Sequence, residues 1–130
     1  MVPAVLLMLA APEAPPLAGG DADSHGCRAS AGYVWSPLRA DCVRLFESGF
    51  RLDPVRPAGS AVISAFALFG GTGASGPVEL WLPGGAAPVR LTGRGGLWRG
   101  HGWALRRHAG RIEVRHAGEL TFAGPYKSFP

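Results

Sequence analysis

Short apolar runs separated by glycine, proline, serine or aspartate recur along the chain from Tyr33 onward, and none keeps a period of 3.6 residues. This pattern predicts short β-strands and almost no helix. The predicted strands cover residues 32–36, 42–46, 50–53, 60–69, 78–82, 89–92, 102–107, 111–116 and 119–122. Glycine supplies the positive φ of tight turns, so residues 47–49 and 117–118 are predicted to form hairpin turns.

Within most of these runs apolar and polar residues alternate, which separates an inward from an outward face. The residues predicted to face the core are Val78, Leu80, Leu82, Val89, Leu91, Trp103, Leu105, Ile112 and Val114, and those predicted to face water are Glu79, Arg90, Arg106, Glu113 and Arg115. The run 60–69 is apolar on both faces. It is either a strand buried on both sides or a strand covered by the amino-terminal segment.

Eight or nine sequential strands with brief connections predict an all-β fold: one small antiparallel meander that forms a barrel or sandwich of about eight strands. The 130 residues leave room for one domain, and 20 Gly and 12 Pro fit a chain with many turns. We expect a leader at 1–20, a linker at 21–26, the all-β domain at 27–123 and an irregular tail at 124–130.

Residues 1–11 form an apolar run shorter than the roughly 20 residues that cross a bilayer as a helix. Small residues follow, and 18–20 offer a cleavage site before Asp21, as in a signal peptide. The sequence therefore predicts an exported protein, periplasmic or secreted, with no transmembrane span in the mature chain. The run carries no Lys or Arg, so a retained segment or a start further upstream stays open. A lipid anchor is disfavoured because polar residues precede Cys27.

The chain has two cysteines, Cys27 and Cys42, so a single internal pairing exists. A disulfide closing a loop of this length contributes roughly 3 kcal/mol in the chain-entropy model. The competing metal site, His25 with both cysteines, lacks a C-x-x-C pair and a fourth ligand. We expect a structural disulfide that holds the amino-terminal segment against the barrel, and neither a metal nor another cofactor.

No pattern for catalysis is complete. The glycine-rich stretch 71–76 has the letters of a dinucleotide fingerprint, but a strand-like run follows it where that motif needs a helix. A G-x-S-x-G elbow is missing. Carboxylates in strand positions, Glu47, Glu79, Glu113 and Glu119, are interpreted as solvated surface acids. No catalytic residue is predicted, and the protein is expected not to be an enzyme.

Arginine dominates the chain's charge, with 12 Arg and one Lys in a formal net charge of +4. Residues 90–116 hold seven arginines and three histidines against the single acid Glu113. The candidate anionic-ligand surface comprises Arg90, Arg99, Arg106, Arg111 and Arg115, and such a surface is suited to nucleic acid, phospholipid, lipopolysaccharide or an acidic protein. Nucleic acid is not the expected partner of an exported chain. The alternative is a solvated barrel exterior in an arginine-biased sequence.

Four aromatic residues form a candidate platform for ligand stacking: Tyr33, Trp35, Trp98 and Trp103. Tyr33 and Trp35 lie beside the predicted bridge, and Trp98 and Trp103 lie among the arginines. Packing in the core is the alternative interpretation for these rings.

Two stretches carry a resemblance: C-R-A-S-A-G-Y-V-W-S at 27–36 and D-C-V-R-L-F-E-S-G-F-R-L at 41–52. They resemble the opening of a group of uncharacterised small exported bacterial proteins, and S-A-F-A-L-F at 64–69 and E-L-W-L-P at 79–83 are similar to its continuation. This resemblance implies export but no activity. More loosely, the chain resembles the membrane-bound inhibitors of C-type lysozyme, small exported disulfide-bonded β-barrels, although it lacks their Ser-Gly-x-x-Tyr and Lys-Gly loops.

The function that these observations favour is a non-enzymatic exported envelope protein that acts by binding an unknown ligand. One alternative is an inhibitor of a lysozyme-like hydrolase that uses an exposed loop at 70–76 or 93–102. Another is a binder of an anionic polymer or lipid through the surface from Arg90 to Arg115. The expected partner is accordingly an anionic envelope polymer or a hydrolase.

Overall fold

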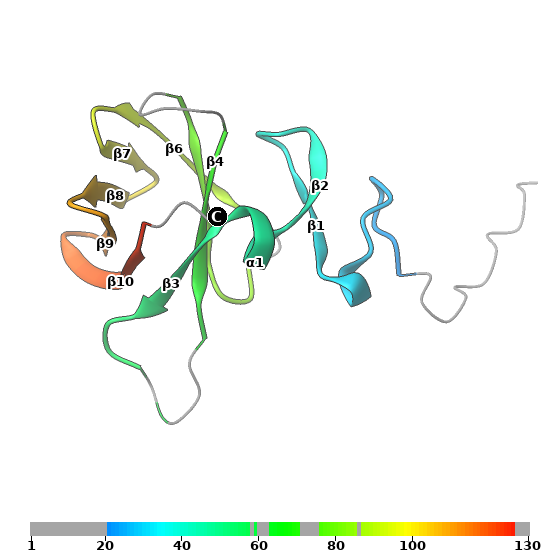
Figure 1. Ribbon diagram of the computed structural model, residues 1–130, viewed down its shortest axis with the longest axis horizontal. Helices are drawn as coiled ribbons and strands as arrows, with labels where there is room; N and C mark the ends of the chain where they lie inside the picture. Colours follow the sequence, from blue (N-terminus) through cyan, green and yellow to red (C-terminus); the bar gives the residue numbers. More distant parts are fainter. Residues whose placement is uncertain (1–20, 58, 60–62, 71–75, 86, 127–130) are drawn as a thin grey trace, which may run out of the picture.

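Eight antiparallel strands form a closed barrel in the computed structural model, which describes residues 21–57, 59, 63–70, 76–85 and 87–126 (Figure 1). The barrel strands are β3 (Phe50–Pro54), β4 (Ala65–Phe69), β5 (Val78–Trp81), β6 (Val89–Arg94), β7 (Leu97–Gly100), β8 (Trp103–His108), β9 (Arg111–His116) and β10 (Glu119–Pro125). Each strand pairs with its neighbours in sequence, and β10 pairs with β3 to close the ring. The predicted all-β meander is confirmed, in its barrel form.

Four successive connections between β6 and β10 are two-residue turns in which both residues have positive φ. They are Gly95-Gly96, His101-Gly102, Ala109-Gly110 and Ala117-Gly118. Turns of this kind match the right-handed twist of the strands they join, and the glycine accepts positive φ without steric cost. The prediction of a turn at 117–118 is confirmed. Turns of the same kind at 95–96 and 101–102 bound β7, a strand that was not among those predicted from the sequence.

The barrel interior holds a continuous apolar core. Its fully buried members are Leu52, Ala65, Ala67, Val78, Leu80, Leu91, Trp98, Leu105, Ile112 and Val114. The residues predicted to face inward lie there, with Leu82, Val89 and Trp103 partly buried at its margin. Alternation along each strand therefore identified the inward face correctly.

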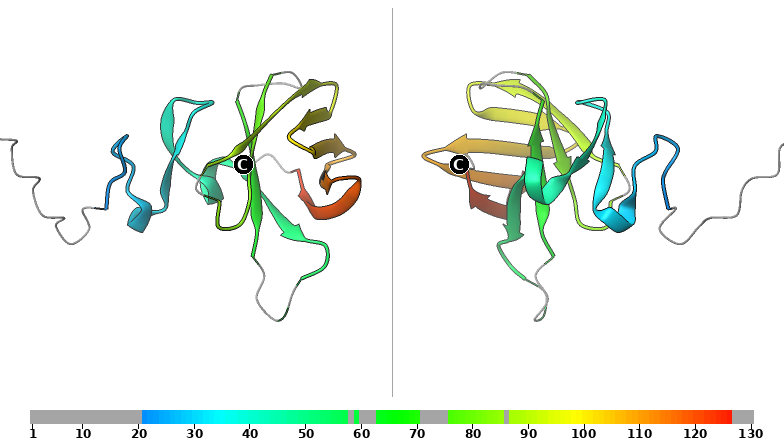
Figure 2. Two further views of the ribbon diagram at one scale, coloured as in Figure 1. Left: turned by 180° about the vertical axis from the view of Figure 1, so that it is seen from behind. Right: turned by 45° about the vertical axis from the view of Figure 1, so that its right-hand side comes forward.

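A separate amino-terminal hairpin packs against the outside of the barrel (Figures 1 and 2). A 3-10 turn, η1 (Ala29–Ala31), precedes β1 (Tyr33–Ser36), which pairs with β2 (Asp41–Arg44). Val43 of the hairpin packs on Leu68 and Trp81, which point outward from β4 and β5. This contact explains why β4 is apolar on both faces and confirms that the amino-terminal segment covers it. The predicted strand 60–69 began too early: within the described residues it starts at Ala65, and Ile63 before it is 60% exposed.

Glu79 is the main correction to the predicted burial. It does point away from the barrel interior, as its alternation requires, but the hairpin covers it and leaves it 1% exposed. Its carboxylate accepts hydrogen bonds from the hydroxyl of Ser36 at 2.7 Å, the backbone N–H of Leu38 at 3.0 Å and the indole N–H of Trp81 at 3.3 Å. Glu79 is thus a polar link between hairpin and barrel rather than a solvated acid.

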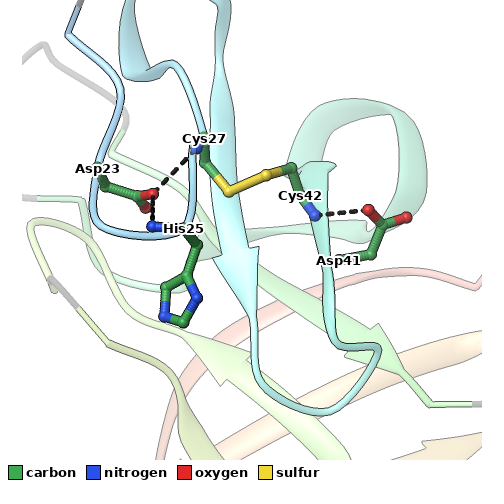
Figure 3. The surroundings of a disulfide bond; sticks show 5 residues. All are labelled: Asp23, His25, Cys27, Asp41 and Cys42. Carbon is green, nitrogen blue, oxygen red and sulfur yellow. Dashed lines mark hydrogen bonds between the residues drawn. A yellow bond between two sulfur atoms is a disulfide. The ribbon is translucent and has the colours of Figure 1, made fainter.

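The predicted disulfide between Cys27 and Cys42 is present, with 5.5 Å between the two Cα atoms (Figure 3). Its expected role needs correction, because both cysteines belong to the amino-terminal segment. The bond fastens the loop before η1 to β2, and the hairpin itself is held on the barrel by the packing of Val43 and by Glu79. Asp23 shapes the loop by accepting hydrogen bonds from the backbone N–H groups of His25 and Cys27.

Several predicted boundaries differ from the structure. The run 42–46 leaves strand geometry after Arg44 and enters a one-turn helix, α1 (Leu45–Ser48), so a hairpin turn at 47–49 is wrong: β2 and β3 are not paired. β10 continues to Pro125, and Tyr126 packs on the core, so the predicted boundary at 123 lies too early. The leader at 1–20 and the loop residues 71–75 lie outside the described residues. Within the described residues no helix has the length and apolarity to cross a membrane.

Candidate functional site

An open groove of about 550 Å³ lies on the outer face of β7, β8 and β9. It is lined by Gly95, Gly96, Leu97, Arg99, Ala104, Arg106, Arg107, His108, Glu113 and Arg115. This face is on the part of the barrel that the hairpin leaves uncovered (Figure 2). We call it the basic groove.

Strand register explains how the basic groove forms. Ala104 on β8 lies directly opposite Arg99 on β7 and Arg115 on β9. The short alanine side chain leaves a hollow between the two long arginines. Arg106 follows two residues further along β8, so its side chain points to the same face. Three arginines therefore surround one small residue.

Most guanidinium groups of this face have no ion pair and no hydrogen bond, whereas four of the five arginines elsewhere in the described chain have a partner. Ion pairs form between Arg44 and Glu47, between Arg51 and Asp53, and between Arg56 and Glu119, and Arg39 donates to the carbonyl of Phe69. Among the described residues, Arg90, Arg94, Arg99, Arg106 and Arg111 have no ion pair and no side-chain hydrogen bond. Arg115 donates only to the carbonyl of Gly118, at 3.3 Å.

One carboxylate accompanies these charges. Glu113 on β9 lies opposite Arg106 on β8 and lines the groove, but the two side chains form no ion pair within 4.0 Å. Because an arginine side chain stays protonated at any ordinary pH, the groove keeps its positive charge. The arrangement is suited to bind an anion, and its lining contains no serine, threonine, cysteine or lysine.

Three of the five arginines predicted as an anionic-ligand surface thus come together: Arg99, Arg106 and Arg115. Arg90 and Arg111 do not line the groove. Arg90 is exposed on β6 opposite Glu79, and Arg111 is exposed on β9 opposite His108. They lie on strands that form or flank the groove and extend the positive face beyond it.

The side chain of Arg107 lies among aromatic rings, and this residue was not among the predicted site residues. Its guanidinium lies 4.5 Å from the ring centroid of Tyr126, 5.4 Å from that of Phe69 and 5.5 Å from that of Trp98. These cation–π contacts hold the charge among core aromatic rings. The alternation along β8 could have revealed this position, because Arg107 shares the inward face of the strand with Trp103 and Leu105.

The four predicted platform aromatics do not form one surface. Trp98 is fully buried in the barrel core and donates its indole N–H to the carbonyl of Gly76, so an exposed stacking role for it is wrong. Trp103 stacks on His116 with 4.1 Å between ring centroids. The other two rings lie in the hairpin, at a distance in sequence and fold from the basic groove.

Tyr33 and Trp35 line a smaller, mostly apolar pocket of about 290 Å³ between the hairpin, Trp81 and Pro88. Trp35 is stacked on His25, with ring centroids 4.0 Å apart, and Arg44 lies over the ring of Tyr33 at 4.4 Å. Both rings are therefore already covered on one side by a residue of the same segment.

Two carboxyl groups outside the basic groove have lowered pKa values because they accept local hydrogen bonds. The backbone N–H of Cys27 lowers the pKa of Asp23 below its usual 3.8, and the hydroxyl of Ser64, with Arg51, lowers the pKa of Asp53. No cluster of three or more metal-ligating side chains occurs within the described parts of the chain.

The structure describes one of the two predicted inhibitory loops in full and the other only at its ends. Residues 93–102 do not form a long loop: they contain the end of β6, the whole of β7 and two tight turns. Most of the segment 70–76 lies outside the described residues. The interpretation as a hydrolase inhibitor stays a prediction.

Comparison with protein-family models, with curated protein sequences and with solved structures finds no match to this chain. The two resemblances stated from the sequence therefore stay predictions. Function has to be inferred from the geometry of the basic groove and its surroundings.

Proposed function

We propose that the protein is a non-enzymatic, exported binding protein that holds an anionic polymer of the cell envelope on the outer face of β6 to β9. The observation that supports this proposal is the set of uncommitted arginines on that face, with Arg99, Arg106 and Arg115 gathered around the hollow at Ala104. A solvated exterior alone does not require that three of them border one concave surface.

Arginine chemistry supports an anionic ligand. The guanidinium is planar and presents several N–H donors that match carboxylate and phosphate oxygens in pairs. Each exposed contact contributes little alone, because water and salt screen it. A polymer that touches several arginines at once sums these contributions, and its binding weakens steeply as salt increases.

The disulfide between Cys27 and Cys42 supports export, since such bonds persist in oxidising compartments. The apolar run 1–11 agrees with the same proposal from the sequence side. In this setting the anionic partner would be a component of the envelope, because an exported protein meets envelope polymers rather than nucleic acid.

The test compares binding of a polyanion to matched charge variants, with polyphosphate and polygalacturonate as probes. Arg99→Glu with Arg115→Glu reverses two charges in the basic groove. Arg28→Glu with Arg56→Glu makes the same change in net charge elsewhere, at two exposed positions. Isothermal titration at several salt concentrations should show at least tenfold weaker binding and a flatter salt dependence for the groove variant, with a small effect in the control.

Equal losses in both double variants would mean that net charge alone attracts the probes, and the proposed site would be wrong. Absence of salt-sensitive binding in the unmodified protein would refute the proposed function itself. A parallel assay of lysozyme inhibition at equimolar protein tests the alternative: stoichiometric inhibition would favour it.

A further inference from the structure

We propose that the hollow at Ala104 is a discrete subsite for one phosphomonoester group, so that the ligand is a phosphorylated molecule rather than a polycarboxylate. This inference rests on the proposed function and narrows it. It is carried by the placement of Arg99, Arg106 and Arg115 around Ala104 and by the balance of charge in the groove lining.

The dimensions fit one compact group. Strands in a sheet lie about 4.8 Å apart, so the Cβ atoms of Arg99 and Arg115 are about 10 Å apart across Ala104. Arg106 projects from the same strand as Ala104, about 7 Å along it. An anion above the alanine methyl group is within reach of long side chains from three directions. A tetrahedral phosphate presents oxygens in all three, whereas a planar carboxylate presents two oxygens on one side.

The charge fits a dianion. Three guanidinium groups face one carboxylate, Glu113, which leaves a formal net charge of two in the outward lining when His108 is counted as neutral. Arg107 lines the same groove, but its guanidinium is held among core aromatic rings. A phosphomonoester carries a charge of about −1.5 to −2 at pH 7, whereas a carboxylate or a phosphodiester carries −1. The monoester therefore balances the lining most closely.

The rim of the groove leaves space for the organic part of such a ligand. Leu97 and the Gly95-Gly96 turn border the hollow on the side of Arg106 and carry no charge. Leu97 is among the exposed large apolar residues of the described chain. A phosphate attached to a carbon skeleton can place its apolar surface there while its oxygens reach the arginines.

The experiment uses glucose 1-phosphate, glucuronate and inorganic phosphate as probes. Binding is measured by isothermal titration and by NMR of the arginine side-chain N–H groups. Glucuronate is a matched sugar that carries a carboxylate in place of the phosphate. We expect glucose 1-phosphate to bind with a stoichiometry of one and at least tenfold more tightly than glucuronate. The N–H signals of the three groove arginines should shift together.

Ala104→Phe fills the hollow without changing any charge, and Ala29→Phe makes the same change at an exposed site in η1, outside the groove lining. We expect Ala104→Phe to weaken glucose 1-phosphate binding at least tenfold, and Ala29→Phe to leave it unchanged. Glu113→Gln provides a second test that does not alter packing. It removes the one acid of the lining, so phosphate binding should tighten several-fold.

Equal binding of glucose 1-phosphate and glucuronate, or unchanged binding in both Ala104→Phe and Glu113→Gln, would overturn the subsite. Inorganic phosphate that binds tenfold more tightly than glucose 1-phosphate would overturn it in favour of a site for free phosphate. In these cases the proposed function would still stand if polyanions require Arg99 and Arg115. If Arg99→Glu with Arg115→Glu leaves polyanion binding unchanged, the proposed function itself is wrong, whatever the result with glucose 1-phosphate.

Discussion

Glu79 provides the sharpest test of how the hairpin is held on the barrel. Glu79→Gln keeps the volume of the side chain but exchanges one carboxylate oxygen for an NH2 group. In the unmodified protein, the carboxylate oxygens of Glu79 accept hydrogen bonds from Ser36, Leu38 and Trp81. In either orientation of the amide, at least one of these donors faces another donor, and the others lose a charged acceptor.

The size of the effect follows from these contacts. A hydrogen bond to a charged group contributes about 1.5–3 kcal/mol, and a buried donor left without an acceptor costs about 1–3 kcal/mol. We therefore expect Glu79→Gln to lower the free energy of unfolding by about 2 kcal/mol or more. For a domain of this size that corresponds to a decrease in Tm of roughly 8 °C or more.

The loss should be localised, which an exchange experiment can show. Because Glu79 joins the hairpin to β5, its replacement favours a state in which the hairpin is undocked and the barrel is intact. Hydrogen exchange should accelerate at the amides of β1, β2 and Leu38, and less in β7 to β9. Glu113→Gln is the matched control: the same chemical change at a partly exposed acid without a hydrogen-bond partner should alter stability by less than about 0.5 kcal/mol. Unchanged unfolding and unchanged exchange in Glu79→Gln would refute the link.

Three further outcomes follow from other contacts. Replacing both bridge cysteines with serine should destabilise the amino-terminal segment by roughly 3 kcal/mol, with the barrel circular dichroism retained; loss of barrel signal would contradict this. Hydrogen bonding lowers the pKa of Asp23 in the folded protein below its usual value of 3.8. The ionised side chain therefore stabilises the loop fully at pH values above 3.8, and this stabilisation is lost as the pH falls through the lower pKa of the folded state. NMR should then show the Cys27 amide shifting only below pH 4, and Asp23→Asn should abolish that step. Gly93→Ala places a Cβ against the backbone carbonyl of Leu97, so it should lower Tm far more than Gly118→Ala, which meets only the strain of positive φ. Similar melting of the two variants would contradict the close approach of β6 and β7.

The sequence predicted the barrel because its information is local. Alternation along each strand placed residues such as Leu105 and Val114 inside, and the turn residues Ala117-Gly118 marked the connection between β9 and β10. β7 was missed because it has only four residues between glycine turns, and its run Leu-Trp-Arg-Gly is too short to show a period. The regular recurrence of two-residue turns ending in glycine was the signal that could have revealed it.

The environment of Glu79 could not be predicted in the same way. Alternation correctly directed its side chain away from the barrel interior, but only the tertiary position of the hairpin determines whether that side meets water. The basic groove could not be predicted either, because it too depends on the tertiary structure. Which arginines gather depends on strand register, and the register places Arg99 and Arg115 opposite Ala104 while Arg90 and Arg111 remain outside the hollow.

The same folding that covers Glu79 also explains why positive charge is concentrated on one face. Most carboxylates of the described chain are committed to local partners: Asp21 to Ser30, Asp23 to the loop backbone, Asp41 to the N–H of Cys42, Glu47 to Arg44, Asp53 to Arg51, Glu79 to Ser36 and Glu119 to Arg56. Glu113 is the described carboxylate without such a partner, and it lies in the groove. A net charge of +4 spread evenly would exert little directional attraction. Three of these acids are paired with neighbouring arginines, and the others accept hydrogen bonds away from β7 to β9. Because the exposed arginines of β6 to β9 have no ion pair, that modest charge becomes a local field over one concave surface, which is the physical requirement for selective binding of an anion.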